Sequence, residues 1–206
     1  MVSYGLVDAD YETRLRAAAG TVDGPVYMLS LARFRSGSGQ VFGRESSRDP
    51  DSRYVPIPLL TTVGASLCFV ADVLAGSGGW QRVGVIRYPT RRAFLALNDR
   101  SDTRDWNATK ERRAERAIML GLVPVAGLPG DLSERVLIEV WHGPTPPQLT
   151  AGSPTEFEVE GTYIGDGRQW SGVRYTAIDP GTALPLEPAR FGYLAVLVEP
   201  VIERWI

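Results

Sequence analysis

The stretch GWQRVGVIRYPTRRAFLALN (79–98) changes from a strand pattern to a helix pattern without a linker. Its first half alternates as a half-buried strand does, and its second half places apolar residues at helical spacing. Pro89 lies at the junction, where it cannot donate to a β-ladder and its fixed φ angle suits the first turn of a helix. The junction therefore predicts a helix that lies against the sheet containing the preceding strand.

Strands and helices alternate in the same way over the first 127 residues. A leading helix is expected at 8–19, with Asp8 or Asp10 as its N-cap. The expected elements that follow are a strand at 25–34, a helix at 54–64, strands at 65–75 and 80–88, a helical stretch in RRAFLALN, a helix at 103–119 and a strand at 121–127. This is the split β-α-β order of a ferredoxin-like fold, an antiparallel sheet with helices on one face.

The remainder of the chain is richer in strands and in proline. After a linker at 128–134, strands are expected at 135–142, 155–164, 169–178 and from 191 onward, with a hairpin at GDGR. Proline-rich loops stand where the first half has helices. We therefore divide the chain into a ferredoxin-like part, 1–130, and a β-rich part, 131–206. The second part is interpreted either as a degenerate repeat that lacks helices or as a separate small β-domain.

Glutamates alternate with apolar residues along 155–164, which predicts one buried face and one solvent-exposed face for this strand. The strands of the first half lack such clean alternation, as expected if helices cover one side of their sheet. The other side would then be an apolar face that promotes association unless a second sheet covers it. We expect that second sheet to come from another copy of the chain or from its own C-terminal half.

Four segments carry a resemblance to a known superfamily: VYMLSLARFR, LLTTVGASLCFVADV, GWQRVGVIRYPTRRAFLALN and RRAERAIMLGLVPV. Together they resemble small bacterial proteins of the dimeric α+β-barrel superfamily, over about residues 25–127. The nearest match is an uncharacterised family of unknown function, and the antibiotic-biosynthesis monooxygenases are more distant kin. The resemblance implies an α+β barrel with an internal cavity, built as a homodimer or as an intrachain pseudo-dimer. It leaves the activity open, because this superfamily hosts oxygenases, cyclases, isomerases and ligand sensors.

Composition excludes several classes of function. With one cysteine and one histidine, the chain has no internal disulfide, no multi-thiolate metal site and no paired-histidine zinc motif. The net charge of -2 is too small to recruit nucleic acid, and no apolar run approaches the ~20 residues that span a bilayer. We expect a cytoplasmic protein without cofactor, metal, nucleic-acid partner or membrane partner.

His142, Tyr163 and Tyr175 are the candidate catalytic residues. Strand alternation places His142 on the same side as Val140, toward the barrel, where its near-neutral pKa suits a general acid or base. Tyr163 and Tyr175 face inward by the same alternation and would donate hydrogen bonds to a substrate. The structural alternatives are a strand-end histidine bonded to the next loop and tyrosines that belong to the core.

Arg87, Ser30 and Cys68 are the candidate substrate-binding residues. Arg87 shares the inward alternation of Val83 and Val85, and would hold a carboxylate or enolate or pair with an acid of the facing sheet. Ser30 stands where the related proteins are expected to carry an asparagine.

Cys68 is expected to point to the cavity beside Asp72, while Leu67, Phe69, Ala71 and Val73 face the helices. Because no neighbour in sequence supplies a base, Cys68 is interpreted as a buried structural thiol more readily than as a nucleophile.

These residues predict a small-molecule-binding α+β-barrel protein. A cofactor-independent enzyme of oxygenase, cyclase or isomerase type, acting on an apolar or aromatic substrate, is one form of this hypothesis. The alternatives are a non-catalytic ligand binder and a structural or interaction protein with a filled barrel. A cavity that contains His142 would favour the first two, and a packed interior would favour the third.

Overall fold

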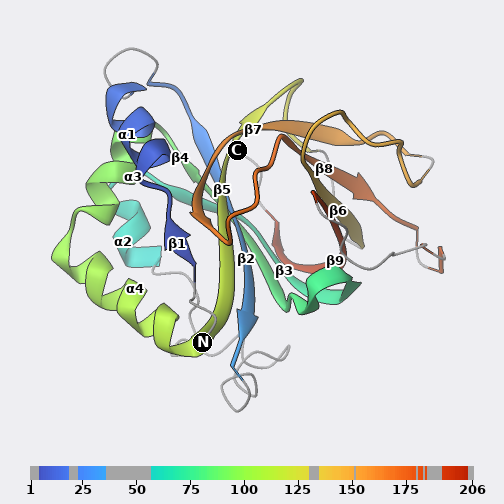
Figure 1. The fold of residues 1–206 in the computed structure, drawn as a ribbon, viewed down its shortest axis with the longest axis horizontal. Coiled ribbons are helices and arrows are strands. Elements are labelled where there is room, and N and C mark those ends of the chain that lie inside the picture. The colour runs from blue at the N-terminus through green and yellow to red at the C-terminus, as the bar shows by residue number, and fades with distance from the viewer. Residues whose placement is uncertain are drawn as a thin grey trace.

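A computed structural model describes residues 5–18, 23–35, 57–129, 135–150, 152–179, 181–182, 184 and 192–203. Figure 1 shows the α-helices gathered on one side of a strongly curved sheet. The elements are β1 (Leu6–Val7), α1 (Ala9–Ala18), β2 (Val26–Phe34), α2 (Ile57–Thr61), β3 (Ser66–Gly76), the 3-10 turn η4 (Ser77–Gly79), β4 (Arg82–Tyr88), α3 (Arg91–Asn98), α4 (Ser101–Arg113), β5 (Ala114–Pro124), β6 (Val136–Trp141), β7 (Thr155–Gly165), β8 (Gly172–Ala177) and β9 (Tyr193–Glu203).

The described strands form one antiparallel sheet that closes on itself. Their order is β1-β7-β5-β2-β4-β3-β9-β6-β8, and β8 also pairs with β7. That last pairing joins all the strands except β1 into a closed barrel within a single chain, so no barrel strand keeps a free edge. The barrel expected from the sequence is therefore confirmed as a mostly-β antiparallel barrel.

Strands of the two halves of the chain occupy two contiguous arcs of the barrel. The first arc has the order β5-β2-β4-β3 and the second has the order β9-β6-β8-β7. Counted along the chain, each arc places its strands in the order fourth, first, third, second. The arcs join at the β3–β9 and β5–β7 pairings, so strands from the C-terminal half face the apolar side of the N-terminal strands.

The barrel interior is a single apolar core to which every barrel strand contributes. Leu29 and Leu31 of β2 meet Ile138 of β6 and Val196 of β9 there, all fully buried. Burial of this many apolar side chains at about 25 cal/mol per Å2 of removed surface is the main term that favours the closed fold.

The helices pack on the outside of the first arc, through the Tyr88-Pro89 junction. Thr90 caps α3, because its Oγ1 accepts a hydrogen bond from the backbone N–H of Ala93 at 3.0 Å. Phe94, one turn later, packs edge-on against Tyr88 with ring centroids 5.1 Å apart. The junction thus ends β4 and begins a helix that covers the outer face of the sheet, as its sequence pattern predicts.

Helix α1 is held on the same face by a close contact with two glycines. Asp8 caps the helix by accepting a hydrogen bond from the backbone N–H of Tyr11 at 2.9 Å. The Tyr11 ring, fully buried, lies over Gly121 of β5 and Gly161 of β7, which are paired in register. A Cβ atom at Gly161 would lie 2.2 Å from Tyr11 Cδ2, so both glycines are needed for the approach of the ring.

The outer face of the second arc differs from the solvent-exposed face that alternation predicts. Glu139 of β6 has no exposed surface and forms an ion pair with Arg174 of β8, Oε2 to Nη1 at 3.3 Å. Arg174 also donates to Glu156 at 2.9 Å and to the carbonyl of Pro146 at 3.2 Å. A proline-rich loop therefore covers this face where the first arc has helices. Of the alternating glutamates of β7, Glu156, Glu158 and Glu160, only Glu158 is exposed.

One predicted helix is too long. Helix α4 ends at Arg113, and the segment from Ala114 to Pro124 is strand β5. The letters AERAIM suit a helix by intrinsic propensity, but pairing with β2 on one side and β7 on the other decides for a strand.

Of the predicted linker 128–134, residues 130–134 lie outside the described residues. Among the described helices, none combines the length and apolarity that a membrane crossing requires.

Replacement of Gly161 by alanine should lower stability, because the new methyl group overlaps the Tyr11 ring. We expect a loss of about 1–3 kcal/mol in the free energy of unfolding, measured by urea denaturation. Gly24→Ala is the matched control, since a Cβ atom there meets no heavy atom within 4 Å. Equal stability of the two variants would contradict the placement of Tyr11.

Residues 1–130 expressed alone should expose the apolar interior of β2 to β5. We expect this fragment to self-associate and to bind a hydrophobic dye, whereas the full chain binds little dye. Light scattering coupled to size exclusion measures the first property and dye fluorescence the second. A monomeric fragment without dye binding would show that the C-terminal strands are not needed to cover this face.

Candidate functional site

Aromatic rings from four strands pack together in the interior of the barrel. Phe157 of β7 packs edge-on against Tyr27 of β2 at 5.8 Å and against Tyr175 of β8 at 5.5 Å, between ring centroids. Phe69 of β3 packs against Tyr175 in the same manner at 6.1 Å. All of these rings are buried. A ligand at this position would have to displace these buried rings.

At one end, three of the predicted site residues come together. Arg87 lies opposite Tyr27 in the β2–β4 ladder and hydrogen-bonds its side chain. Burial raises the pKa of Tyr27, an effect that the hydrogen bond from Arg87 opposes. Cys68, fully buried, lies close enough to raise the pKa of both Tyr27 and Tyr175. Arg87, Cys68 and Tyr175 thus point inward as predicted, and the sequence argument missed Tyr27.

The predicted orientation of the β3 side chains is wrong in part. The β3–β4 register shifts between Leu67 and Phe69, so Cys68 is an extra residue in the ladder. Because of this bulge, Cys68 and Phe69 both enter the interior core, while Leu67 packs on the helix side. Asp72 lies on the outer face, where it pairs with Arg82 at 2.6 Å. Ser30 also lies on the outer face, since its neighbours Leu29 and Leu31 point inward.

Tyr163 does not point into the barrel. It belongs to the helix-side core, where its ring packs edge-on against Phe94 of α3 at 4.8 Å. The β5–β7 register shifts twice, and Glu160 and Tyr163 are the extra residues of β7. A bulge reverses the side-chain alternation beyond it, so counting from Phe157 gives the wrong face for Tyr163.

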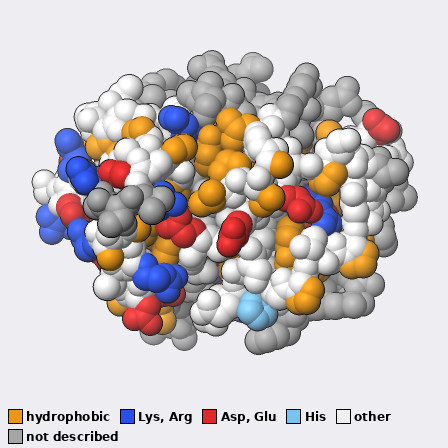
Figure 2. Space-filling model, turned by 90° about the horizontal axis from the view of Figure 1, so that it is seen from above, with side chains coloured by type: hydrophobic (Ala, Val, Ile, Leu, Met, Phe, Trp, Pro, Cys, Tyr) orange, Lys and Arg blue, Asp and Glu red, His pale blue; other side chains and the backbone are white. Residues whose placement is uncertain are grey.

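His142 is exposed and not inside the barrel. Strand β6 ends at Trp141, and the backbone N–H of His142 donates to the carbonyl of Gly192 at 2.8 Å. Gly143, with a φ angle of +82°, then turns the chain away, so the alternation of β6 does not extend to position 142. Figure 2 shows the single histidine, in pale blue, at the surface.

The opposite end of the barrel carries a cluster that the sequence argument missed. All barrel neighbours are antiparallel, and β3 and β7 are four pairing steps apart, so these two strands run in the same direction. The connections that follow them, β3–β4 and β7–β8, therefore lie at one end, which we call the hairpin end. Trp80 precedes β4 and Trp170 precedes β8, so each hairpin supplies a tryptophan to this end. The shared signal is a tryptophan after a glycine-containing turn, in GSGGW and GDGRQW.

An arginine covers each of these tryptophans. The guanidinium of Arg116, near the start of β5, lies 4.4 Å from the centroid of the Trp80 ring. Arg168 lies 4.7 Å from the centroid of the Trp170 ring. Both tryptophans are buried, with exposed fractions of 4% and 6%. These cation–π contacts place two positive charges against two indole rings at the hairpin end.

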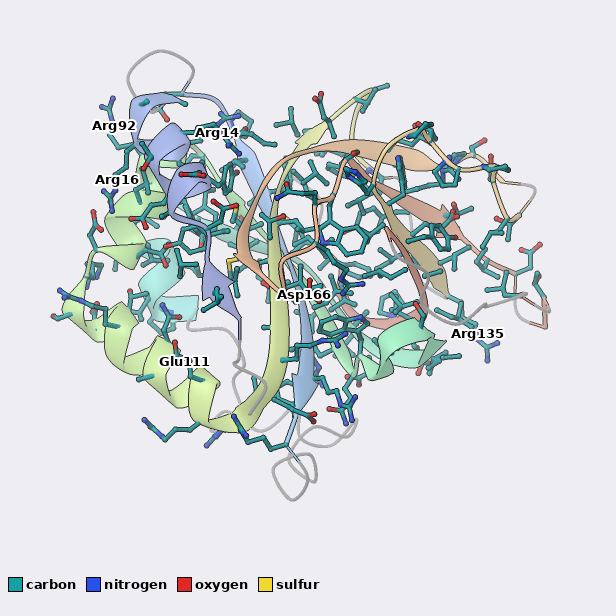
Figure 3. The ribbon with its side chains drawn as sticks, in the orientation of Figure 1. Arg14, Arg16, Arg92, Glu111, Arg135 and Asp166 are labelled. Atoms are coloured by element: carbon teal, nitrogen blue, oxygen red, sulfur yellow. The ribbon has the colours of Figure 1, made fainter. Side chains whose placement is uncertain are left out.

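The arginines at the hairpin end differ in their partners. Arg168 pairs with Asp166 at 2.7 Å, and Arg33 pairs with Glu115 at 3.1 Å. Burial would raise the pKa of Asp166, but the bonds from Arg168 and the charge of Arg116 hold it below its usual value. For Arg116, no described carboxylate lies within ion-pair distance, and burial followed by the charge of Arg168 lowers its pKa. In Figure 3, Asp166 lies in front of the barrel strands, apart from Arg14 and Arg16 on the helix side.

No family model and no curated protein matches this sequence. Two solved structures are similar to it. The crystal structure of the methylated RPA0582 protein has a TM-score of 0.46 and 20% identity, covering 64% of this chain and all of that one, 100%. The structure of RPA0582, a protein of unknown function from Rhodopseudomonas palustris, has a TM-score of 0.44 and 18% identity, covering 60% and 99%. We draw nothing about family or function from likenesses of this size.

Within the described residues, no three His, Cys, Asp or Glu side chains are grouped as a metal site requires. The described site residues offer hydrogen bonding, positive charge and aromatic surface. The hairpin end combines all three in Arg116, Trp80 and Trp170.

Stability should fall as the pH rises above about 10, because burial raises the pKa of several tyrosines, Tyr163 to about 12. A group whose pKa is raised by folding stabilises the protein fully below its unfolded pKa, near 10, and loses that effect as the pH approaches the folded value. The other tyrosines with raised values include Tyr11, Tyr88 and Tyr175. Each of these tyrosines should lower the free energy of unfolding by about 1.4 kcal/mol per pH unit in this window.

Urea denaturation at a series of alkaline pH values measures this loss, and the ultraviolet absorbance of tyrosinate measures ionisation in the folded state. Arginine does not titrate in this range. The pH dependence of stability therefore comes from the tyrosines, Cys68 and Lys110. Stability that stays constant from pH 9 to about 11 would contradict the burial of these hydroxyls.

Proposed function

We propose that this protein binds a small molecule at the hairpin end of its barrel. The observation that carries the proposal is the pair of buried tryptophans, Trp80 and Trp170, each covered by an arginine guanidinium. Binding sites for small molecules combine apolar and aromatic walls with a few polar groups that fix orientation. The hairpin end supplies both kinds of group within the residues described above.

The interior supports binding at an end in preference to the centre. Phe157 contacts both Tyr27 and Tyr175 inside the barrel, and a ligand in their place would have to displace buried aromatic surface. Removal of such packing costs several kcal/mol, about 3–5 for a single large aromatic side chain. Binding at Arg116 would need no such displacement, because this side chain is partly exposed.

Binding without catalysis is favoured over the enzyme hypothesis. Of the predicted catalytic residues, His142 is exposed and Tyr163 packs against helix α3, so neither shares a site with Tyr175. The remaining polar pair inside the barrel, Arg87 and Tyr27, is already engaged in its own hydrogen bond. These placements support the non-catalytic alternative for the same fold.

A filled barrel that serves a structural or interaction role is the second candidate. It is favoured by the single interior core that side chains from all the barrel strands form together. The two candidates differ in one respect: the structural role requires no ligand at the hairpin end.

We also propose that each arc of the barrel is a ferredoxin-like sheet and that residues 131–206 are a degenerate repeat of residues 1–130. The same relative strand order in the two arcs supports this, as does the tryptophan that follows the equivalent hairpin in each. Kinship with the dimeric α+β-barrel superfamily follows as part of the same proposal, with the second sheet supplied by this chain.

A small-molecule screen read by intrinsic tryptophan fluorescence and thermal shift tests the binding proposal. A ligand at 100 times its Kd adds about 2.7 kcal/mol of stability, which raises Tm by roughly 5–10 °C for a chain of this size. We expect the fluorescence response to be lost in Trp80→Phe and Trp170→Phe. Trp141→Phe is the control, since Trp141 lies on the outer face against Gly172.

A library of apolar and aromatic compounds in which nothing produces a saturable shift would favour the structural candidate. Binding that persists in both Trp80→Phe and Trp170→Phe but is lost in Arg87→Gln would move the site to the opposite end of the barrel.

A further inference from the structure

We infer that the ligand of the hairpin end is an anion, whose carboxylate binds the guanidinium of Arg116. This inference rests on the proposed function and narrows it to a chemical class. It starts from the four charged side chains that act on Arg116, which form two ion pairs of their own. Arg33 has Glu115 and Arg168 has Asp166.

Among the described residues, Arg116 has no carboxylate within ion-pair distance, and the four charges that act on it cancel in pairs. Its guanidinium packs on Trp80 and interacts with the charges of Arg168 and Asp166. Because Asp166 is within ion-pair distance of Arg168, the local sum of charge stays positive. Arginine remains protonated in proteins, so this positive charge persists at any physiological pH.

Two N–H donors at the hairpin end also lack acceptors among the described residues. Nε of Arg116 and Nε1 of Trp170 are both buried and neither makes a hydrogen bond. Buried donors without partners cost about 1–3 kcal/mol each, and in folded proteins an ordered water, an ion or a ligand usually satisfies them. Trp170 is 6% exposed and Arg168 lies over its ring, which places its donor in the same cluster as Arg116.

A carboxylate has two acceptor oxygens, which suits a guanidinium that offers an unpartnered Nε–H donor. Arginine binds carboxylates through two parallel N–H bonds, one of which can come from Nε. The Nη2 edge of Arg116 lies against the turn of η4, where a Cβ atom at Gly78 would be 3.3 Å away. Gly78 has a φ angle of +83°, so the turn itself requires glycine and presents no side chain to the guanidinium.

Benzoate and benzamide are the probes that test this inference. They have nearly the same shape and differ in charge, so their comparison in the wild-type full chain needs no variant. Arg116→Gln removes the charge, and Arg116→Lys keeps the charge but loses the planar pair of donors. Arg14→Gln is the matched control, because Arg14 also stacks on an aromatic ring, Tyr11, at 5.4 Å, but on the helix side.

We expect benzoate to quench tryptophan fluorescence and raise Tm with at least about tenfold higher affinity than benzamide, which corresponds to one charge-assisted contact. In Arg116→Gln the affinity for benzoate should fall by at least about tenfold, to the level of benzamide. Arg116→Lys should be intermediate and Arg14→Gln unchanged. Added salt should weaken benzoate binding in the wild type and not in Arg116→Gln.

The outcomes separate this inference from the proposed function. Equal binding of benzoate and benzamide, lost in Trp80→Phe, would overturn the anion inference and leave a neutral ligand at the hairpin end. A preference for benzoate that survives in Arg116→Gln would overturn it as well. If neither benzoate nor inorganic phosphate binds, water alone satisfies the buried donors and the inference fails. In that case the library screen decides separately whether the proposed function stands.

Discussion

Closure of the barrel is the constraint on which the rest of the structure depends. The first four barrel strands expose apolar side chains on one side, and helices cover only their other side. The β3–β9, β5–β7 and β7–β8 pairings bring the C-terminal strands across that apolar side. Hydrogen bonding and apolar burial are therefore satisfied together, since the same pairings that complete the ladders also remove the interior from water. The interior that results is an apolar core to which every barrel strand contributes.

Antiparallel closure also decides which residues meet at each end. Tyr27 begins β2, Arg87 lies near the end of β4 and Cys68 lies near the start of β3, so the three lie at one end. The two hairpins lie at the other, and with them Trp80 and Trp170, which are 90 positions apart in sequence. Near the start of β5, Arg116 has no carboxylate within ion-pair distance in the part of the chain that the structure describes. The proposed ligand site is a consequence of strand direction as much as of residue type.

Several elements of the fold follow from local sequence. Pro89 and Thr90 mark the change from β4 to α3, and Asp8 caps α1, because the positions of proline and of capping side chains depend on nearby backbone alone. Inward alternation held for Arg87 and Tyr175, because strands β4 and β8 contain no extra residue in their ladders. It failed for Tyr163, where each bulge reverses the faces. A bulge depends on the pairing partner, so alternation along one strand cannot reveal it.

The sequence by itself determined the number and order of most strands, the strand-to-helix junction at Pro89 and the need for a second layer over an apolar face. Those features depend on periodicity and on the backbone preferences of single residues, which act over a few positions. Only the tertiary structure decided that the barrel closes within one chain, that a proline-rich loop buries Glu139 against Arg174, and that Arg116 shares an end with both tryptophans. These features arise from contacts between segments distant in the chain, and the energy of such contacts appears only when the strands are paired.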